Sequence, residues 1–441
     1  MEKREHDNNK GDVFALNQAL IDELKNKGCI QTASIEAAFR AVLRHLFLPG
    51  TPLEEAYSDR AISAKQDQDG QWISSSSQPA IMAIMLEQLG LEPGHRVLEI
   101  GAGTGYNAAL MAHLVGEEGQ IVTIDIEEDL VEAAREHLTM AGFEQVQVVH
   151  GDGGYGYPGG ASFDRIILTV GAPDITPAWW DQMKPGGRMV LPLMLKGSMK
   201  SIAFEQVNDH LASTSVRECS FISLRGDFAS MFSNQIQLGP NRGLYLEPAA
   251  EFLIDRDGAY GALTGVSKDW ATGVEVTVWD IMAGELWTWL SLHEPRICKL
   301  VAEGDMVERN IVPPLIGVDG QQKSAGTVVL LDKAGLVALM RPPGQSVPLV
   351  ERDKLFSPDS PFVLPFALFV RQFGSDESIA QRLITQIQAW DAAGRPSSEK
   401  MQIRVYTKYF EYMPSEGEYV IEKQWTKLVL EWPAAVRATE G

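Results

Sequence analysis

The stretch from Val97 to Gly105 reads VLEIGAGTG, a run of apolar residues that leads directly into three closely spaced glycines. The run is typical of a buried strand, and apolar residues at helical spacing resume from Asn107. Because glycine lacks a Cβ, such a turn lets a ligand approach the backbone, and the free N–H groups at the start of the next helix are available to bind it. The stretch therefore predicts a ligand-binding turn between a strand and a helix.

Helices and short apolar strands alternate on both sides of this turn. The sequence predicts helices over 79–89, 107–115, 130–141 and about 177–183, and strands over 96–100, 120–124, 146–149, 163–169 and 188–192. Strands that alternate with helices of this length are typical of a parallel sheet with helices on both faces. The predicted fold class is therefore a doubly wound α/β domain.

The regions that flank this alternation have other patterns. A helix is predicted over 34–46, and the polar stretch 58–77 is predicted to be a long loop with a functional role. Past residue 225, period-two strands are predicted at 274–278 and 401–405, with a helix between them that has Ser375 as its N-cap and ends at Gly394. We therefore expect two domains, 1–225 and a C-terminal α+β domain over 226–441.

The composition excludes several classes of protein. The chain has 441 residues, 45% of them hydrophobic, and its 59 acidic and 38 basic side chains give a formal charge of -21. This charge repels phosphate, so nucleic acid and anionic membranes are not expected as partners. No stretch approaches the roughly twenty apolar residues that span a bilayer, and the polar N-terminus lacks a signal peptide, so a cytoplasmic location is expected. Three widely spaced cysteines predict neither a disulfide framework nor a metal site.

The glycine spacing distinguishes between two cofactors. The dinucleotide fingerprint requires a third glycine where this chain has Tyr106, which argues against NAD. The G-x-G-x-G spacing instead resembles that of class I methyltransferases, which bind S-adenosylmethionine. Asp125 ends the next strand, where it can accept both ribose hydroxyls, and Asp152 follows the third strand, where it can reach adenine. The expected cofactor-binding residues are Glu99, Gly101, Gly103, Gly105, Asp125, Ile126, Asp152 and Gly153.

Residues from about 20 to 225 resemble the protein-L-isoaspartate O-methyltransferase family. The resemblance rests on AFRAVLRHLF at 38–47, SQP at 77–79, the glycine turn, GDG at 151–153, TVGA at 169–172 and KPGGR at 184–188. It implies a carboxyl O-methyltransferase with Ser77 as its active-site serine and with Ser76, Gln78, Val170 and Gly171 contacting the substrate. An ionised carboxylate needs mainly alignment and desolvation to attack a methyl group, so a hydroxyl that orients it is sufficient. Alternatively, Ser77 is an N-cap of the helix that begins at Pro79, a role compatible with substrate contact.

The C-terminal half resembles a narrower group. The stretch from Ala389 to Pro396 and the strand 402–406 resemble the extension of bacterial homologues that are encoded with ribosomally made, modified peptides such as lanthipeptides. The resemblance implies that an aspartate of a cyclised precursor peptide is methylated and that the ester collapses to an aspartimide, with residues 226–441 recognising the peptide. Two alternatives stay open: repair of isoaspartyl proteins, and a peptide-binding module in which the methyltransferase half is secondary.

Overall fold

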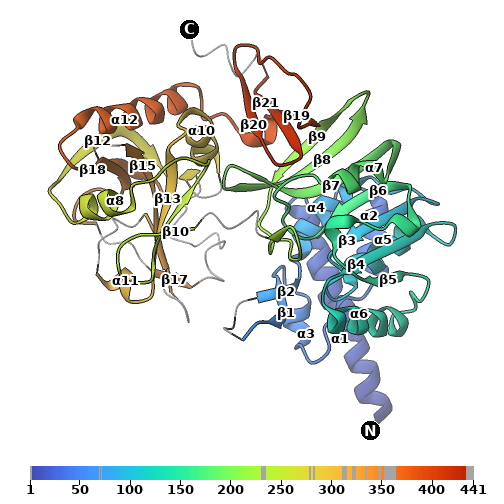
Figure 1. Ribbon diagram of the computed structural model, residues 1–441. Coiled ribbons are helices and arrows are strands. Elements are labelled where there is room, and N and C mark those ends of the chain that lie inside the picture. Colours follow the sequence, from blue (N-terminus) through green and yellow to red (C-terminus); the bar gives the residue numbers. More distant parts are fainter. Residues whose placement is uncertain are drawn as a thin grey trace.

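The computed structural model of the chain describes residues 2–68, 70, 72–229, 235–277, 280–281, 284–309, 315–319, 324–332, 335–345, 349–351 and 364–433. Figure 1 shows that these residues form two lobes, each built on its own sheet. Within the described residues the first lobe has a ten-stranded sheet and the second a nine-stranded sheet. A separate hairpin of β1 (Ile62–Gln66) and β2 (Trp72–Ser76) stands beside the first lobe.

Five parallel strands form the centre of the first lobe. Along the sheet they are β5 (Gln147–His150), β4 (Gln120–Asp125), β3 (Arg96–Ile100), β6 (Phe163–Leu168) and β7 (Met183–Leu195). β3, which leads into the glycine turn, pairs in parallel with β4 on one side and β6 on the other. Two antiparallel strands, β8 (Ser198–Val207) and β9 (His210–Glu218), extend the sheet beyond β7.

Helices cover both faces of this sheet, which confirms the predicted doubly wound α/β fold. They are α1 (Glu2–Asn26), α2 (Ala33–Ala41), α3 (Leu53–Ala56), α4 (Pro79–Leu89), α5 (Tyr106–Val115), α6 (Glu128–Met140) and α7 (Pro177–Asp181). α4 begins at a proline, whose missing N–H costs nothing in the first turn, and ends at Gly90, which adopts the left-handed conformation (φ 58°). Short 3₁₀ segments occur at Arg44–Phe47, Gly153–Tyr155, Pro158–Gly160 and Ser398–Lys400.

The second lobe is an antiparallel sheet with helices against it, which confirms the predicted α+β character. The one parallel pair among its described strands is β14 with β17. Its elements are β10 (Ile236–Gln237), β11 (Leu244–Pro248), α8 (Arg256–Leu263), β12 (Ser267–Val276), α10 (Glu285–His293), β13 (Ile297–Glu303), α11 (Asp305–Glu308), β14 (Ile316–Asp319), β15 (Ser324–Asp332), β16 (Gly335–Met340), β17 (Leu349–Glu351), β18 (Phe366–Phe373) and α12 (Glu377–Ala392).

The C-terminal strands return to the first lobe, which the division at residue 225 did not anticipate. β19 (Gln402–Thr407) pairs with β9, and β21 (Thr426–Glu431) and β20 (Glu418–Glu422) follow it in the same sheet. The period-two pattern correctly predicts β19 as a strand, but it does not specify which sheet edge the strand joins. Residues 226–441 therefore do not lie in one lobe, because the chain leaves the first sheet and then completes it.

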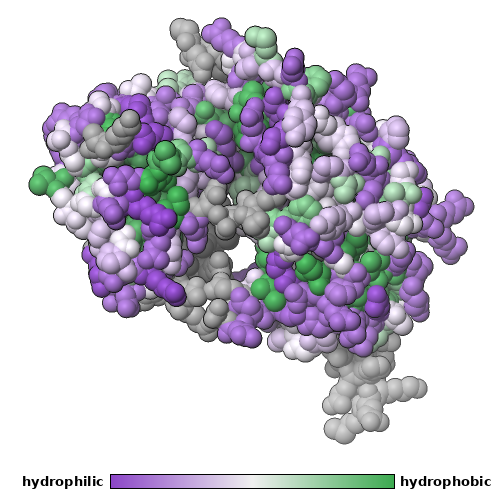
Figure 2. Space-filling model, viewed as in Figure 1, coloured by the Kyte–Doolittle hydropathy of each residue, from purple (hydrophilic) through white to green (hydrophobic). Residues whose placement is uncertain are grey.

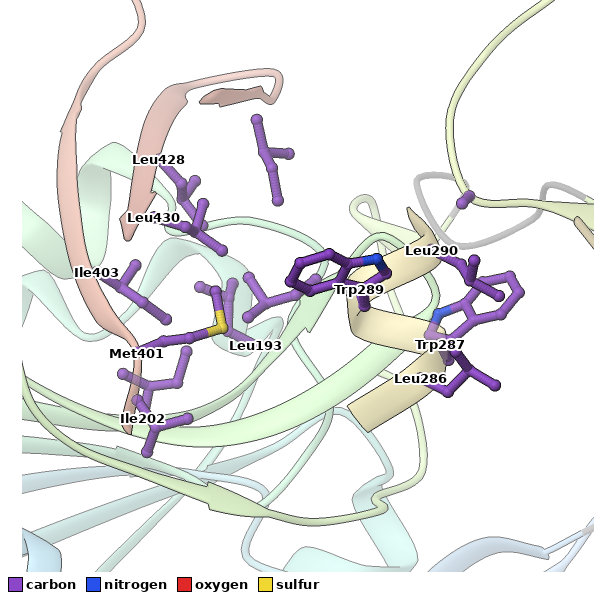
Figure 3. Close-up of a cluster of buried hydrophobic side chains, with 14 of the residues drawn as sticks. Leu193, Ile202, Leu286, Trp287, Trp289, Leu290, Met401, Ile403, Leu428 and Leu430 are labelled. Atoms are coloured by element: carbon purple, nitrogen blue, oxygen red, sulfur yellow. The ribbon is translucent and has the colours of Figure 1, made fainter. Parts of the chain in front are cut away.

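A continuous apolar core joins the two lobes. Helix α10 of the second lobe lies against one face of the ten-stranded sheet, and its Trp289 points towards the side of Leu193, Met401 and Leu430 (Figure 3). Trp179, Trp287 and Trp289 are buried, and Trp180 is half-buried. A second core fills the opposite face beneath α1, α2, α4 and α5, and a third lies on the far side of the second sheet.

Three local predictions differ from the structure. The stretch 58–77 contains the β1–β2 hairpin instead of a loop. Its polar residues have low strand propensity, and they form two short strands because these strands pair with each other. The helix predicted over 34–46 ends at Ala41, since Val42 is extended and Arg44 turns inward in a separate 3₁₀ segment. Asp376, not Ser375, caps α12, although Gly394 does end that region with a φ of 75°.

Candidate active site

The glycine turn and the end of β4 are tied together by one carboxylate. The N–H of Gly103 donates to Asp125 Oδ2 at 3.0 Å, and the N–H of Glu127 donates to Asp125 Oδ1 at 3.2 Å. Gly101, Gly103 and Gly105 all have positive φ, a conformation that other residues adopt with strain. Asp125 is almost fully buried yet lines a cavity, so its carboxylate can accept further hydrogen bonds from a ligand there.

Glu99 lies behind the turn and does not line the cavity. Its side chain is fully buried and accepts hydrogen bonds from Asn107 Nδ2 and Thr123 Oγ1, both at 2.7 Å. Burial raises the pKa of Glu99 to about 7. These contacts join β3 to the start of α5 and to β4, so Glu99 holds the turn in place. At this position behind the turn, Glu99 is not placed to contact a ligand in the cavity directly.

The other predicted cofactor residues divide in the same way. Ile126 and Gly153 line the cavity with Gly101, Gly103 and Asp125. Gly105 and Asp152 do not: Gly105 packs against Leu138 of α6. Asp152 accepts hydrogen bonds from the N–H groups of Gly154 (2.8 Å) and Asp227 (2.9 Å), so it shapes the backbone beside Gly153.

The serines of the β1–β2 hairpin form the opposite wall. Ser74 to Gln78 all line the cavity, so the predicted substrate residues Ser76, Ser77 and Gln78 lie there together with the glycine turn. The hydroxyl of Ser76 is buried and has no hydrogen-bond partner in the described part of the chain. Gln78, not Ser77, occupies the N-cap position of α4, and its side chain makes no capping hydrogen bond. The interpretation of Ser77 as the N-cap is therefore wrong.

A buried arginine fixes this wall. Arg44 is fully buried and donates to the carbonyl oxygens of Ala56 (3.0 Å), Ser58 (3.0 Å), Arg60 (2.9 Å) and Ser77 (3.1 Å). One guanidinium thus holds the chain on both sides of the hairpin. The neighbouring His45 contacts the hydroxyl of Tyr57 at 2.8 Å and does not line the cavity.

The segment after β6 supplies another part of the wall. Val170 lines the cavity, whereas Gly171 is buried beneath it and pairs with the segment after β9 through hydrogen bonds to Ile222 and Leu224 at 2.8 Å. Three residues later, the fully buried Asp174 accepts hydrogen bonds from the N–H of Trp425 (2.7 Å) and the hydroxyl of Thr426. The returning C-terminal strands therefore support this wall from behind.

The cavity bounded by these walls has a volume of about 1080 Å³. Figure 2 shows the surface hollowed between the two lobes, and the cavity is lined by residues from both of them. The turn with Asp125 forms one part and the serine wall another, and Glu218 to Arg225, Gly197 to Met199 and Lys299 complete the lining. A volume of this size accommodates both a nucleoside cofactor and part of a second molecule.

An ion-pair group spans the side of the cavity near Asp125. Glu127 pairs with Lys65 of the hairpin and with Arg225 at 2.5 Å, and Lys65 also pairs with Asp129 at 2.6 Å. These contacts connect β1, the end of β4 and the segment after β9. Sequence reasoning missed Arg44, Lys65, Glu127, Arg225 and Lys299, because each belongs to a separate segment and carries no local motif.

The described residues contain no helix that is long and apolar enough to cross a membrane. Within the same residues, no group of three or more histidine, cysteine, aspartate or glutamate side chains could hold a metal ion. Cys29, Cys219 and Cys298 are all free.

The first lobe is similar in sequence to a family of known proteins. Residues 15–228 match the family model of protein-L-isoaspartate(D-aspartate) O-methyltransferase. A protein-L-isoaspartate O-methyltransferase from Methanopyrus kandleri is 37% identical over 212 residues, which cover 48% of this chain and 91% of that protein. A protein of the same name from Thermotoga maritima is 37% identical over 207 residues, 46% of this chain and 65% of that protein, slightly less than two thirds of its length.

A solved structure of a protein-L-isoaspartate O-methyltransferase superposes with a TM-score of 0.50 at 24% identity. The superposition covers 91% of this chain and 99% of the other, so it supports the fold across both lobes. The matches of the first lobe to the family model and to the curated relatives agree with the motifs along β3, β4 and the serine wall. The chain therefore belongs to the protein-L-isoaspartate(D-aspartate) O-methyltransferase family.

Proposed function

We propose that this protein is an S-adenosylmethionine-dependent carboxyl O-methyltransferase that acts on an aspartyl or isoaspartyl carboxylate of a peptide. One observation carries the proposal: a single cavity contains the glycine turn with Asp125 and, facing them, the serine wall from Ser74 to Gln78. A donor bound on the turn and an acceptor held by the serines would share that cavity, as direct group transfer requires.

The residues present fit the cofactor. Gly103 lines the cavity with a φ of 52°, and a Cβ built there would lie 3.5 Å from the carbonyl oxygen of Ser75 in the serine wall. Asp125 retains lone pairs that can accept hydrogen bonds from two adjacent hydroxyls, and Ile126 and Gly153 offer an apolar surface and an accessible backbone. When bound, S-adenosylmethionine supplies an electrophilic methyl group on sulfur.

The protein's part in the transfer is to position the acceptor. A carboxylate oxygen forms the new bond to the methyl carbon while the carbon–sulfur bond breaks, and the products are a methyl ester and S-adenosylhomocysteine. No proton has to be removed, because the carboxylate is ionised at neutral pH. The unpartnered Ser76 hydroxyl and the nearby Ser77 can donate hydrogen bonds to the other carboxylate oxygen and align the attacking one.

Two acceptors are supported by different observations. Isoaspartyl repair is supported by the names of the relatives that match the first lobe. Methylation of an ordinary aspartate in a ribosomally made, modified peptide rests on the resemblance of the C-terminal half, and Lys299 of the second lobe gives the cavity a further possible contact with a peptide. In that case the following backbone nitrogen attacks the ester and displaces methanol, which leaves an aspartimide.

Two substitutions test the division of labour. Asp125→Ala should weaken the binding of S-adenosylhomocysteine about tenfold or more, because two hydrogen bonds to a charged acceptor are lost. Ser77→Ala should lower kcat by about tenfold or more with cofactor affinity unchanged, since Ser77 is assigned to the acceptor. Calorimetry and methyl transfer to an isoaspartyl peptide measure the two effects, and Ser34→Ala, an exposed serine of α2, is the control.

The acceptors are separated by mass spectrometry of the product. Repair predicts a methyl ester on a short isoaspartyl peptide, whereas the modified-peptide function predicts a cyclised precursor that ends lighter than its substrate by one water. If cofactor affinity falls in parallel with turnover in Ser77→Ala, the serine acts structurally and its assignment to the acceptor is wrong.

A further inference from the structure

Among the residues that the structure describes, Lys299 is the one residue of the second lobe that lines the cavity. It lies in the middle of β13, opposite Glu247 of β11. Its ammonium donates to the carbonyl oxygen of Gly197 at 2.7 Å and lies 4.8 Å from the centroid of the Trp287 ring. Trp287 is itself anchored by a 2.9 Å hydrogen bond from its indole N–H to Lys196 O. The lysine is therefore held in one orientation by both lobes.

The charge of Lys299 has no close counter-charge in the described part of the chain. The cavity lining contains a second cation, Arg225, but Arg225 is paired with Glu127. Likewise, Glu218 in the lining is paired with the buried Lys200. No described carboxylate lies within 4.0 Å of the Lys299 ammonium, although Glu247 favours its charged form from the neighbouring strand. Burial, with a smaller contribution from Lys200, lowers the pKa of Lys299.

Such a cation is a binding group for an anion that enters the cavity. Of the three N–H donors of the ammonium, one is used by Gly197. The other two can bind a carboxylate, and little conformational entropy is lost because Trp287 and Gly197 already fix the side chain. The proposed substrate is a peptide that already carries one carboxylate into the cavity, so a further carboxylate of the same peptide is the fitting ligand for Lys299.

Resting on the proposed function, we propose that Lys299 determines substrate specificity by binding a second carboxylate of the acceptor peptide, separate from the one that is methylated. The second carboxylate belongs either to a neighbouring acidic side chain or to the C-terminus of the peptide. The second lobe thereby selects acidic peptides through a contact away from the transferred methyl group.

The test uses full-length protein and four isoaspartyl peptides of otherwise identical sequence. A flanking acidic residue is either kept or replaced by its amide, and the C-terminus is either free or amidated. Lys299→Gln should lower kcat/KM for the matching acidic peptide about tenfold or more and should change that for the doubly neutral peptide less than twofold. Lys299→Arg should restore most of the preference, because it restores the charge.

Lys268→Gln is the matched control. Lys268 is another lysine of the second lobe that lies over a tryptophan, 4.0 Å from the centroid of Trp270, but it pairs with Glu377 and does not line the cavity. This variant should behave as the wild type with all four peptides. S-adenosylhomocysteine should bind Lys299→Gln and the wild type equally, and weaker cofactor binding would assign the lysine to the cofactor and overturn the proposal.

Peptide binding to protein saturated with S-adenosylhomocysteine separates this proposal from the proposed function. If the wild type prefers acidic peptides and Lys299→Gln loses the preference, the subsite is supported even when no peptide is methylated, in which case the proposed function fails alone. Equal affinity of the wild type for acidic and neutral peptides, or an equal effect of Lys299→Gln on both, refutes the subsite whatever the turnover.

Discussion

Asp174→Ala removes one of the contacts by which the C-terminal strands support the cavity wall, beside those of Lys423 with the carbonyl oxygens of Pro173 and Met194. The carboxylate is fully buried and accepts hydrogen bonds from the N–H of Trp425 (2.7 Å) and from the hydroxyl of Thr426. A hydrogen bond to a charged group contributes roughly 1.5–3 kcal/mol. The substitution leaves these two donors without an acceptor, together with the N–H of Ile175, which donates to Asp174 Oδ1 at 2.7 Å. We therefore expect the free energy of unfolding to fall by about 3–5 kcal/mol, the usual range for removing one member of a buried charged network.

Urea denaturation measures this change, and two further variants locate it. Thr426→Val keeps the shape of the side chain but removes the hydroxyl, so it should cost about 1–2 kcal/mol. In the double variant the two effects should not add, because the second substitution has no hydrogen bond left to break. Asp181→Ala, an exposed carboxylate at the end of α7, should change stability by less than about 0.5 kcal/mol.

Amide hydrogen exchange shows which strands lose stability in Asp174→Ala. Amides of β20 and β21 should exchange faster in Asp174→Ala, whereas those of β3 and β4 should be protected as in the wild type once stability is matched. A loss below about 1 kcal/mol, or strict additivity with Thr426→Val, would refute the reasoning that Asp174 fastens the returning strands.

The remaining predictions concern two cations that donate to backbone carbonyl oxygens. Burial lowers the pKa of Lys423 from 10.5 to about 8, so the unfolded chain binds more protons between these pH values, and the free energy of unfolding should rise with pH across this window by up to roughly 3 kcal/mol relative to Lys423→Met. Urea denaturation of both proteins at pH 7.5 to 10 measures it; parallel profiles would contradict it. Arg44→Lys keeps the charge but loses the planar fork that binds four carbonyl oxygens. It should therefore lower kcat/KM about tenfold or more by misplacing Ser77, with S-adenosylhomocysteine affinity retained; an unchanged kcat/KM would contradict this.

The sequence predicts the parts of this protein whose signals are local. The apolar run and the glycines from Val97 to Gly105 predict the strand, the turn and the helix, and Asp125 can be placed because parallel strands end at the same edge of a sheet. The residues that complete the site are found only by pairing across the chain. Arg44 lies within the helix predicted over 34–46, where nothing in the sequence marks it as buried. Only the fold shows that its guanidinium is buried and donates to four carbonyl oxygens.

Long-range pairing also explains the two errors about the C-terminal half and the serine stretch. The alternation in 402–407 predicts a strand, but its partner β9 lies about two hundred residues earlier, and period two is equally compatible with either sheet. The serines of β2 have low strand propensity, and they form a strand because β1 pairs with them. The hydrophobic pattern of a strand indicates which of its faces is apolar. Which other strand it pairs with depends on the whole fold.

Because the C-terminal strands return to the first sheet, the second lobe cannot be removed as a separate C-terminal domain. A chain cut after Arg225 would lack β19 to β21 as well as the second lobe, and it would expose the edge of β9 and the apolar face that Trp289 covers. Loss of activity in such a fragment would therefore reflect a damaged first lobe as readily as lost substrate recognition. The second lobe is an insertion between β9 and β19 of one sheet, and α10 fixes it against that sheet. Because the same insertion places Lys299 beside Gly197, substitution of this single side chain separates recognition from folding, which truncation cannot do.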